Sequence, residues 1–163
     1  MRYLLISLLL MFAYCANAHA EGLPPLTWTE VQPQDQLWVN AGFYSFHFDS
    51  SLGLNNANYG LGMEYRYSST SSLTVGQFHN SDRVTSHYAG MYWEPVTWGK
   101  VKLGAVIGGF DGYPHMLNGG WFPAVIPVAS VEFDRVGANI AFVPTLQNRL
   151  YGAVSVQLKV RLY

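Results

Sequence analysis

YGLGMEYRY, at residues 59–67, is the stretch that decides the fold class. Its odd positions hold only aromatic or large apolar side chains, whereas its even positions hold Gly60, Gly62, Glu64 and Arg66. A period of two is typical of a β-strand with two different faces. In a soluble sandwich the charged face would meet water, but in an outer-membrane barrel the apolar face meets lipid and the polar face lines the interior.

The last segment of the chain repeats this alternation, and comparable segments precede it. We count eight strands, an even number, each near or above the roughly 9 to 11 residues that cross a bilayer when tilted. The predicted strands lie at residues 37–48, 58–67, 72–81, 85–94, 100–110, 121–133, 136–144 and 150–162. Short and longer connections alternate between them, as in outer-membrane barrels. We therefore predict an all-β fold, an eight-stranded antiparallel up-and-down transmembrane β-barrel over residues 37–163; a soluble β-sandwich is the alternative.

The composition agrees with a membrane barrel and excludes other classes. Half of the 163 residues are hydrophobic and only 12% are charged, about half the charged share of a soluble globular protein. The net charge of −1 leaves no electrostatic footprint for nucleic acid. The charge-free stretch 112–131 contains three prolines, which would leave helical hydrogen bonds unmade in lipid. Aromatic residues are expected at the membrane interfaces, with Trp38 at the lower rim.

The first twenty residues have the pattern of a secretory signal peptide. Arg2 precedes an apolar run over residues 3–16, and small residues follow. Cleavage after Ala18 and cleavage after Ala20 both fit, and we favour Ala20. A transmembrane anchor is the alternative, although the run is shorter than the roughly 20 residues that a spanning helix needs. The predicted location is the outer membrane of a Gram-negative bacterium.

The single cysteine, Cys15, falls within the predicted signal peptide. It suggests lipoprotein acylation as an alternative, but Tyr14 occupies the preceding position, where a small residue is expected. Residues 21–36 contain three prolines and are predicted to form a periplasmic segment ahead of the barrel.

The interior of the predicted barrel divides into a charged lower half and an open upper half. Strand direction places Glu64 and Lys159 inward near the periplasmic end, where opposite charges are expected to pair. Gly60 and Gly62 lie higher on the inward face and carry no side chain, which predicts an apolar cavity open toward the outer surface. These glycines can also serve only to let the strand bend and coil.

Several pieces of the chain resemble one family. They are WFPAVIPVASVEF at residues 121–133, IAFVPTLQ at 140–147 and NANYGLGM at 56–63, with fainter likeness in FHNSD at 78–82 and YWEPV at 92–96. Together these pieces resemble the lipid A palmitoyltransferase (PagP) family. The resemblance implies a monomeric barrel that holds an acyl chain in its outer half. It also implies transfer of palmitate from a glycerophospholipid to lipid A, without metal or cofactor.

The resemblance also suggests catalytic residues at the upper ends of two strands. The family carries a His on the first strand and an Asp-Ser pair on the third. Ser45 falls on the family His in a gap-free alignment, whereas an alignment with a shorter following loop gives that role to His47, so the sequence leaves both positions open. Ser81 matches the family Ser, whereas Asn80 stands where the family has Asp, and Asp82 is a possible substitute. His47, Ser81 and Asn80 are therefore the candidate catalytic residues.

Two prolines suggest how a lipid would enter. Pro127 and Pro144 lie on adjacent predicted strands, and each lacks an N–H donor, so backbone pairing between these strands should be weak. The resemblance implies a side opening here for a lipid tail, and Pro127, Pro144, Gly60 and Gly62 are the candidate substrate-binding residues. The alternative is that both prolines lie near strand ends and have little effect.

The leading interpretation is an outer-membrane acyltransferase whose partners are phospholipid and lipid A, with no metal site. Two features depart from the family. Residues 21–36 are too short and too rich in proline for its amphipathic helix, and prolines beside its first two strands are missing. A non-catalytic barrel that binds lipid or supports the membrane is the first alternative. A lipid A deacylase, with Ser81 as nucleophile and a nearby His as base, is the second.

Overall fold

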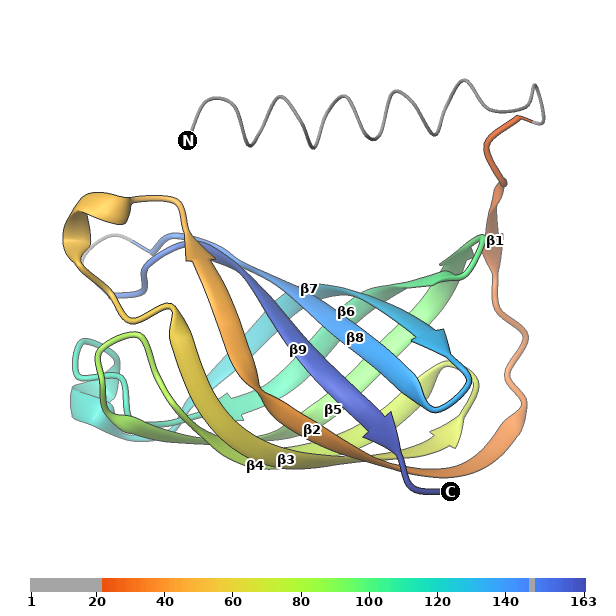
Figure 1. Cartoon of the computed structure of the whole chain (residues 1–163), viewed down its shortest axis with the longest axis horizontal. Coiled ribbons are helices and arrows are strands. Elements are labelled where there is room, and N and C mark those ends of the chain that lie inside the picture. Colours follow the sequence, from red (N-terminus) through yellow and green to blue (C-terminus); the bar gives the residue numbers. More distant parts are fainter. Residues whose placement is uncertain (1–21, 147–148) are drawn as a thin grey trace.

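The computed structural model describes residues 22–146 and 149–163, so the predicted signal peptide lies outside the described residues. The described chain is built from β-strands that wrap into one barrel (Figure 1). The strands are β1 (Leu26–Trp28), β2 (Pro33–His47), β3 (Ala57–Ser68), β4 (Ser71–His79), β5 (Thr85–Trp98), β6 (Val101–Phe110), β7 (Phe122–Phe133), β8 (Val136–Val143) and β9 (Ala153–Arg161). Two short 3-10 turns, Ser50–Leu52 and Leu117–Gly119, lie in connections. No helix among the described residues is long and apolar enough to cross a membrane.

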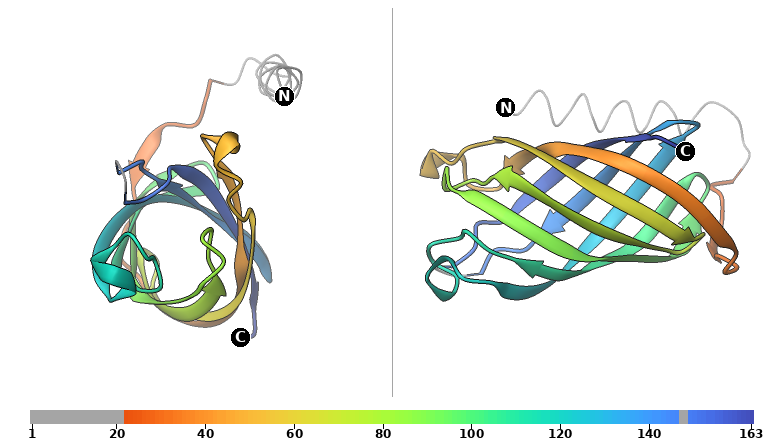
Figure 2. Two further views of the ribbon diagram at one scale, coloured as in Figure 1. Left: turned by 90° about the vertical axis from the view of Figure 1, so that its left-hand side faces the viewer. Right: turned by 90° about the horizontal axis from the view of Figure 1, so that it is seen from below.

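The barrel closes through antiparallel pairing of each strand from β2 to β9 with its neighbours. The sheet runs in chain order, and the circle closes where β9 pairs with β2. Viewed along its axis, the sheet forms a ring (Figure 2). The predicted eight-stranded antiparallel up-and-down barrel is confirmed, and a two-sheet sandwich is excluded because one continuous sheet encloses the interior.

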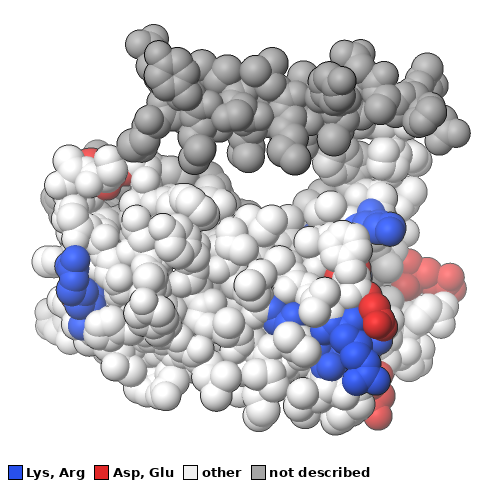
Figure 3. All heavy atoms as spheres, viewed as in Figure 1, with Lys and Arg blue, Asp and Glu red and all other residues white. Residues whose placement is uncertain are grey.

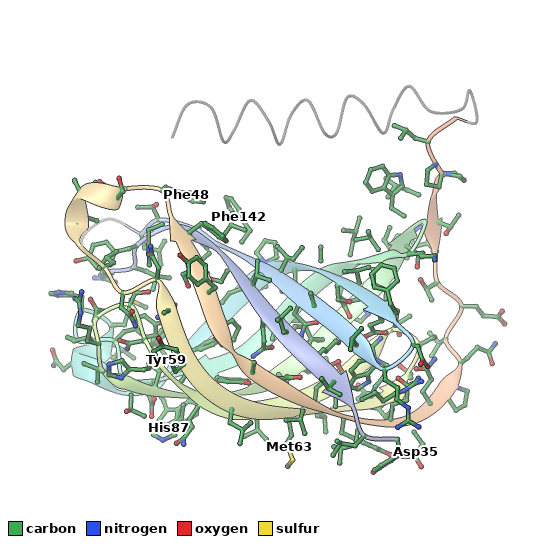
Figure 4. All side chains as sticks on the ribbon, in the orientation of Figure 1. Asp35, Phe48, Tyr59, Met63, His87 and Phe142 are labelled. Atoms are coloured by element: carbon green, nitrogen blue, oxygen red, sulfur yellow. The ribbon has the colours of Figure 1, made fainter. Side chains whose placement is uncertain are left out.

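The two faces of β3 lie as the alternation predicts. Tyr59, Leu61 and Met63 are exposed on the outside, and Met63 projects away from the barrel (Figure 4). The even residues Glu64 and Arg66 are almost fully buried. In the space-filling view, charged side chains gather toward the two ends and leave an uncharged belt between them (Figure 3). The barrel therefore has an apolar outer wall and a polar lower interior.

The two ends of the barrel differ in their connections. At one end the strands are joined by short turns at residues 69–70, 99–100 and 134–135, and we call this the turn end. The other end, on the left in Figure 1, carries the connections at residues 48–56, 80–84, 111–121, and 144–146 with 149–152, and we call it the loop end.

The start of the barrel differs from the prediction. Residues 21–36 were expected to lie ahead of it, but β2 begins at Pro33, and β1 pairs with β5 from Leu26↔Trp98 to Trp28↔Val96. β4 begins at Ser71, opposite Trp93, so the last residues of β5 extend beyond it. β1 pairs with the edge of β5 that β4 leaves open there. The expected turn at residues 95–99 is therefore mostly strand.

A β-bulge at Gly42 sets which residues of β2 face inward. The register of β2 shifts between Ala41 and Phe43 against β3 and between Asn40 and Phe43 against β9, and a Cβ atom on Gly42 would collide with the backbone of β3. Even-numbered residues face the interior on the turn-end side of the bulge, and odd-numbered residues do so on its loop-end side. Trp38 and His47 therefore both face the interior. The predicted place of Trp38 at the rim is wrong. It is buried, with the Lys159 ammonium 4.9 Å from its ring centroid.

The lower interior is filled by a charge cluster of Glu64, Glu94, Glu132, Arg66, Lys102 and Lys159. Glu64 lies 3.0 Å from Arg66 and 3.1 Å from Lys159, which confirms the predicted pairing. Glu132 was not predicted to take part, but it lies 2.7 Å from Arg66 and 2.8 Å from Lys159. The three acids and three bases leave the cluster formally neutral and close the turn-end half of the barrel with packed side chains.

Candidate functional site

A cavity of about 350 Å³ occupies the loop-end half of the barrel. Its volume lies at the lower end of the roughly 300 to 1,000 Å³ typical of small-molecule sites. Tyr92 and Val106 border it toward the charge cluster, and most of its lining is apolar. Aromatic rings form much of one wall, with 4.9 Å between the ring centroids of Phe43 and Phe78. Its shape and chemistry suit a hydrocarbon chain better than a polar ligand.

Gly60 and Gly62 do not line this cavity, contrary to the prediction. A Cβ atom on Gly62 would meet the hydroxyl of Tyr88, and one on Gly60 would meet Phe78. Gly62 therefore makes room for the Tyr88 side chain of β5, whereas Gly60 allows close approach of β4, because its Cβ would collide with the Gln77 carbonyl and with the Cα and Cβ atoms of Phe78. The free space lies toward β7 and β8 instead.

The cavity extends to a break in the sheet between β7 and β8. Their ladder ends at Val128↔Ala141, whereas β7 stays paired with β6 as far as Phe122. β8 likewise stays paired with β9 up to Val143. The weak pairing predicted from the prolines is confirmed: Pro127 is the first residue of β7 beyond the ladder, and Pro144 directly follows β8.

Both sides of this break contribute to the lining. Pro123 and Val125 of β7 belong to the cavity wall although they are exposed on the outside of the barrel, and Pro144 lies opposite them in the lining. The cavity therefore reaches the outer wall sideways between the strands. Pro127 borders the break without lining the cavity.

The loop end brings His47 and Ser81 into direct contact. His47 is the last residue of β2, and Ser81 lies in the turn after β4. The distance between His47 Nε2 and Ser81 Oγ is 2.8 Å, and both residues line the cavity. On the other side of the ring, His47 Nδ1 lies 2.8 Å from Asn56 Oδ1. The three side chains form a continuous hydrogen-bonded row.

The direction of these hydrogen bonds follows from the chemistry of the groups. An amide oxygen can only accept a hydrogen bond, so Nδ1 of His47 is protonated and its N–H donates to Asn56 Oδ1. In the neutral imidazole Nε2 is then the acceptor, and the Ser81 hydroxyl donates to it. This order of serine, histidine and orienting amide is the general arrangement of an activated hydroxyl nucleophile.

Ser45 lies below this row and has other partners. Its hydroxyl donates to Asn58 Oδ1 over 2.7 Å and lies 2.9 Å from Ser155 Oγ. Of the two candidates for the histidine role, His47 is thus the one beside Ser81. The reason is the bulge at Gly42, because it places Ser45 and His47 on the inward face of β2, with His47 nearer the loop end.

Asn80 has a structural environment. It is fully buried, and its Nδ2 donates to Ser86 Oγ and to the Gly112 carbonyl, each over 2.8 Å. Its Oδ1 accepts from the backbone N–H groups of Asp82 and Val84. Asn80 therefore fixes the turn that carries Ser81, and its side chain makes no hydrogen bond to His47 in the described residues.

Tyr113, from the connection between β6 and β7, adds a polar group to the cavity lining. Its ring meets Phe122 edge to face, with 5.8 Å between centroids. Burial raises the pKa of the Tyr113 hydroxyl, and the nearby Asp82 carboxylate raises it further. Tyr113 therefore stays neutral and keeps a proton to donate.

Asn56 is the site residue that the sequence prediction missed. It lies in a connection with several asparagines, and its role depends on the meeting of two loops, which no local pattern reveals. Within residues 22–146 and 149–163 no group of three or more His, Cys, Asp or Glu side chains is placed to hold a metal ion.

Comparison with known proteins defines the fold class and goes no further. No protein-family model matches the chain, and no curated protein matches it. Among solved structures, it is similar to TMB2.3, a de novo designed transmembrane β-barrel determined by solution NMR. The TM-score is 0.57 with 13% identity, over 79% of this chain and 95% of the designed one. The chain therefore has the fold of a transmembrane β-barrel.

Proposed function

We propose that this protein is an outer-membrane lipid acyltransferase that moves an acyl chain from a glycerophospholipid to lipid A. One observation carries the proposal: the Ser81–His47–Asn56 row stands at the mouth of an apolar cavity that opens sideways between β7 and β8. The resemblance to the PagP family suggests the substrate classes, and the neighbourhood of the row and the cavity supports the choice of acyl transfer.

The orientation follows from the two ends of the barrel. Outer-membrane barrels have short turns on the periplasmic side and longer loops outside, so the loop end and the site face the cell exterior. The predicted signal peptide supports export to that membrane. His47 and Ser81 then lie near the level of the lipid headgroups of the outer leaflet.

An acyl tail in the membrane would enter through the break beside Pro127 and Pro144. Hydrocarbon gains little by leaving lipid for another apolar space, so the aromatic cavity serves to hold and orient the tail. The ester of the donor would then lie at the rim, within reach of Ser81. His47 acts as the general base because its Nε2 is the ring nitrogen that accepts the hydrogen bond from the Ser81 hydroxyl.

A lipid A deacylase is the second candidate, and the same row of side chains favours it. Water in place of an acceptor hydroxyl would convert transfer into hydrolysis without any change in the protein groups. The two functions differ in their products, because a transferase adds a chain to lipid A and a deacylase removes one.

The test is expression in a Gram-negative strain that lacks its own lipid A palmitoyltransferase, followed by mass spectrometry of lipid A. A mass gain of one palmitoyl group is expected. A loss of one acyl chain would replace the transferase with the deacylase. An unchanged spectrum from a folded, membrane-inserted protein would leave a non-catalytic barrel.

Matched variants connect the product to the site. Ser81→Ala is expected to abolish the mass change, whereas Ser50→Ala, at an exposed serine of the same end, should preserve it. Both variants should show the heat-dependent shift in gel mobility of a folded barrel.

A further inference from the structure

We infer that Ser81 is a covalent nucleophile that carries the acyl group as an ester, and that Asn56 is the positioning residue for its base. This inference rests on the proposed function and deepens it, because acyl transfer can also proceed directly from donor to acceptor. The two routes make different demands on the histidine, and the geometry distinguishes them.

In direct transfer, the base must face the hydroxyl of the incoming acceptor lipid. Here the basic nitrogen of His47 faces a hydroxyl of the protein instead, with 2.8 Å between Nε2 and Ser81 Oγ. The other ring nitrogen is held by Asn56 over 2.8 Å. Both nitrogens are thus committed, and the proton nearest to the base belongs to Ser81.

The other serines of the cavity show what a structural hydroxyl looks like here. Ser45 and Ser155 also line the cavity and are buried. Ser45 donates to the amide oxygen of Asn58 and lies against Ser155, so its partners are an amide and a hydroxyl. Neither group can remove a proton. Among the three lining serines, Ser81 is the one that contacts an imidazole.

The first step is balanced within these groups. Ser81 Oγ forms a bond to the ester carbonyl carbon of the phospholipid while its proton passes to His47 Nε2. The tetrahedral intermediate then collapses, the bond between that carbon and the glycerol oxygen breaks, and His47 returns the proton to the leaving oxygen. A lysophospholipid departs, and Ser81 holds the acyl group.

The second step reverses the first with another hydroxyl. The lipid A hydroxyl attacks the acyl carbonyl as His47 takes its proton, and the bond to Ser81 Oγ breaks. Ser81 then regains the proton. Water that attacks in place of lipid A releases a free fatty acid, so slow hydrolysis is an expected side reaction.

Asn56 orients the ring without adding charge. Its amide oxygen selects the tautomer with the proton on Nδ1, but it stabilises the imidazolium less than a carboxylate would. Asn56→Ala should therefore slow acylation by about tenfold or more, because a misplaced base costs much of the rate. Asn56→Asp keeps the acceptor and should restore the reaction. A merely structural asparagine would not show this rescue.

The test traps the nucleophile in the full-length protein folded in detergent micelles. A fluorophosphonate with a long alkyl chain should label Ser81, as located by mass spectrometry of peptides. Ser81→Ala should remain unlabelled, and His47→Ala should label at least tenfold more slowly. Ser50→Ala, at an exposed serine outside the cavity lining, should label like the wild type.

Acyl transfer is measured on the same preparations with phospholipid and lipid A. Transfer without labelling of Ser81 would overturn the covalent route and leave the acyltransferase standing. Labelling of Ser81 without transfer would support the nucleophile and overturn the transferase. A folded protein with neither labelling nor transfer would overturn both.

Discussion

The hydroxyl of Tyr88 lies so close to Gly62 that a Cβ atom on this glycine would collide with it. The same hydroxyl lies against Gly76 on the neighbouring strand, and Gln157 Nε2 donates to it over 3.4 Å. Glycines on β3 and β4 thus form the socket for one aromatic side chain of β5. The aromatic wall of the cavity depends on this fit, because Tyr88 and its neighbours Phe43 and Phe78 pack as one group.

This fit predicts that Gly62→Ala destabilises the barrel. The added methyl group collides with the Tyr88 hydroxyl, and overpacking of this kind costs about 1 to 3 kcal/mol. Denaturant unfolding in lipid vesicles measures the loss. Tyr88→Phe in the same chain removes the oxygen and should recover part of the stability. Gly22→Ala, where a Cβ atom meets open space, is the matched control. Equal stability of Gly62→Ala and wild type would contradict the socket.

The charge cluster gives a second prediction. Glu64→Gln keeps the shape of the side chain but leaves the buried Lys159 and Arg66 with less negative charge around them. Breaking a buried pair from one side costs about 3 to 5 kcal/mol, so the free energy of unfolding should fall by about that amount. Glu30→Gln, at an exposed position, should change it little.

A double substitution tests the cause of that loss. Glu64→Gln together with Lys159→Met removes charge of both signs, and its stability should lie above that of Glu64→Gln alone. If the double variant is the less stable of the two, an unpaired charge is not the source of the cost.

Asn80 provides a third prediction, because it separates a catalytic role from a structural one. In Asn80→Asp the two donors to Ser86 and Gly112 are lost, and a carboxylate oxygen faces the Gly112 carbonyl. A buried group left without its partner costs about 1 to 3 kcal/mol. We expect a lower unfolding temperature, with transfer activity retained well below that temperature. Loss of activity at full stability would instead place Asn80 in the chemistry.

The sequence was sufficient for the features that repeat along the strands. The alternation at residues 59–67 predicts which side chains of β3 lie outside, because a side-chain period of two leaves no other choice once one face is apolar. The sequence also predicts the pairing of Glu64 with Lys159. The alternation places both side chains inside the barrel, and the strand directions place both near its turn end. The break between β7 and β8 follows from two residues that cannot donate a ladder hydrogen bond.

Features that depend on two distant segments could not be predicted in this way. The bulge at Gly42 reverses the inward parity of β2, which no local pattern reveals. Trp38 was misplaced because the preference of Trp for membrane interfaces does not say which face of the strand it occupies. Asn56 reaches His47 only through the fold of its loop. Gly60 and Gly62 were assigned to empty space, but β4 approaches Gly60 closely and the Tyr88 side chain of β5 lies against Gly62. Each error arises where packing, rather than the local pattern, decides the position.

The break between β7 and β8 gives the last prediction, which concerns the entry of lipid. If the ladder continued beyond Val128↔Ala141, Ile126 and Val143 would be the next inward pair. Cysteines at these two positions, in Ile126→Cys/Val143→Cys, should form a disulfide slowly because no ladder holds the strands together there. Once formed, the bond closes the break, so acyl transfer should fall by tenfold or more and return on reduction.

A matched pair lies in the intact part of the same ladder. Val131→Cys/Ala138→Cys joins residues that are already partners, so its disulfide should form faster and leave transfer unchanged. The comparison holds the strands, the bond and the reductant constant and moves the link from the inward face at the break to the outward face of the intact ladder. Full activity of the oxidised Ile126→Cys/Val143→Cys protein would mean that lipid reaches Ser81 by another route, over the loop end rather than through the wall.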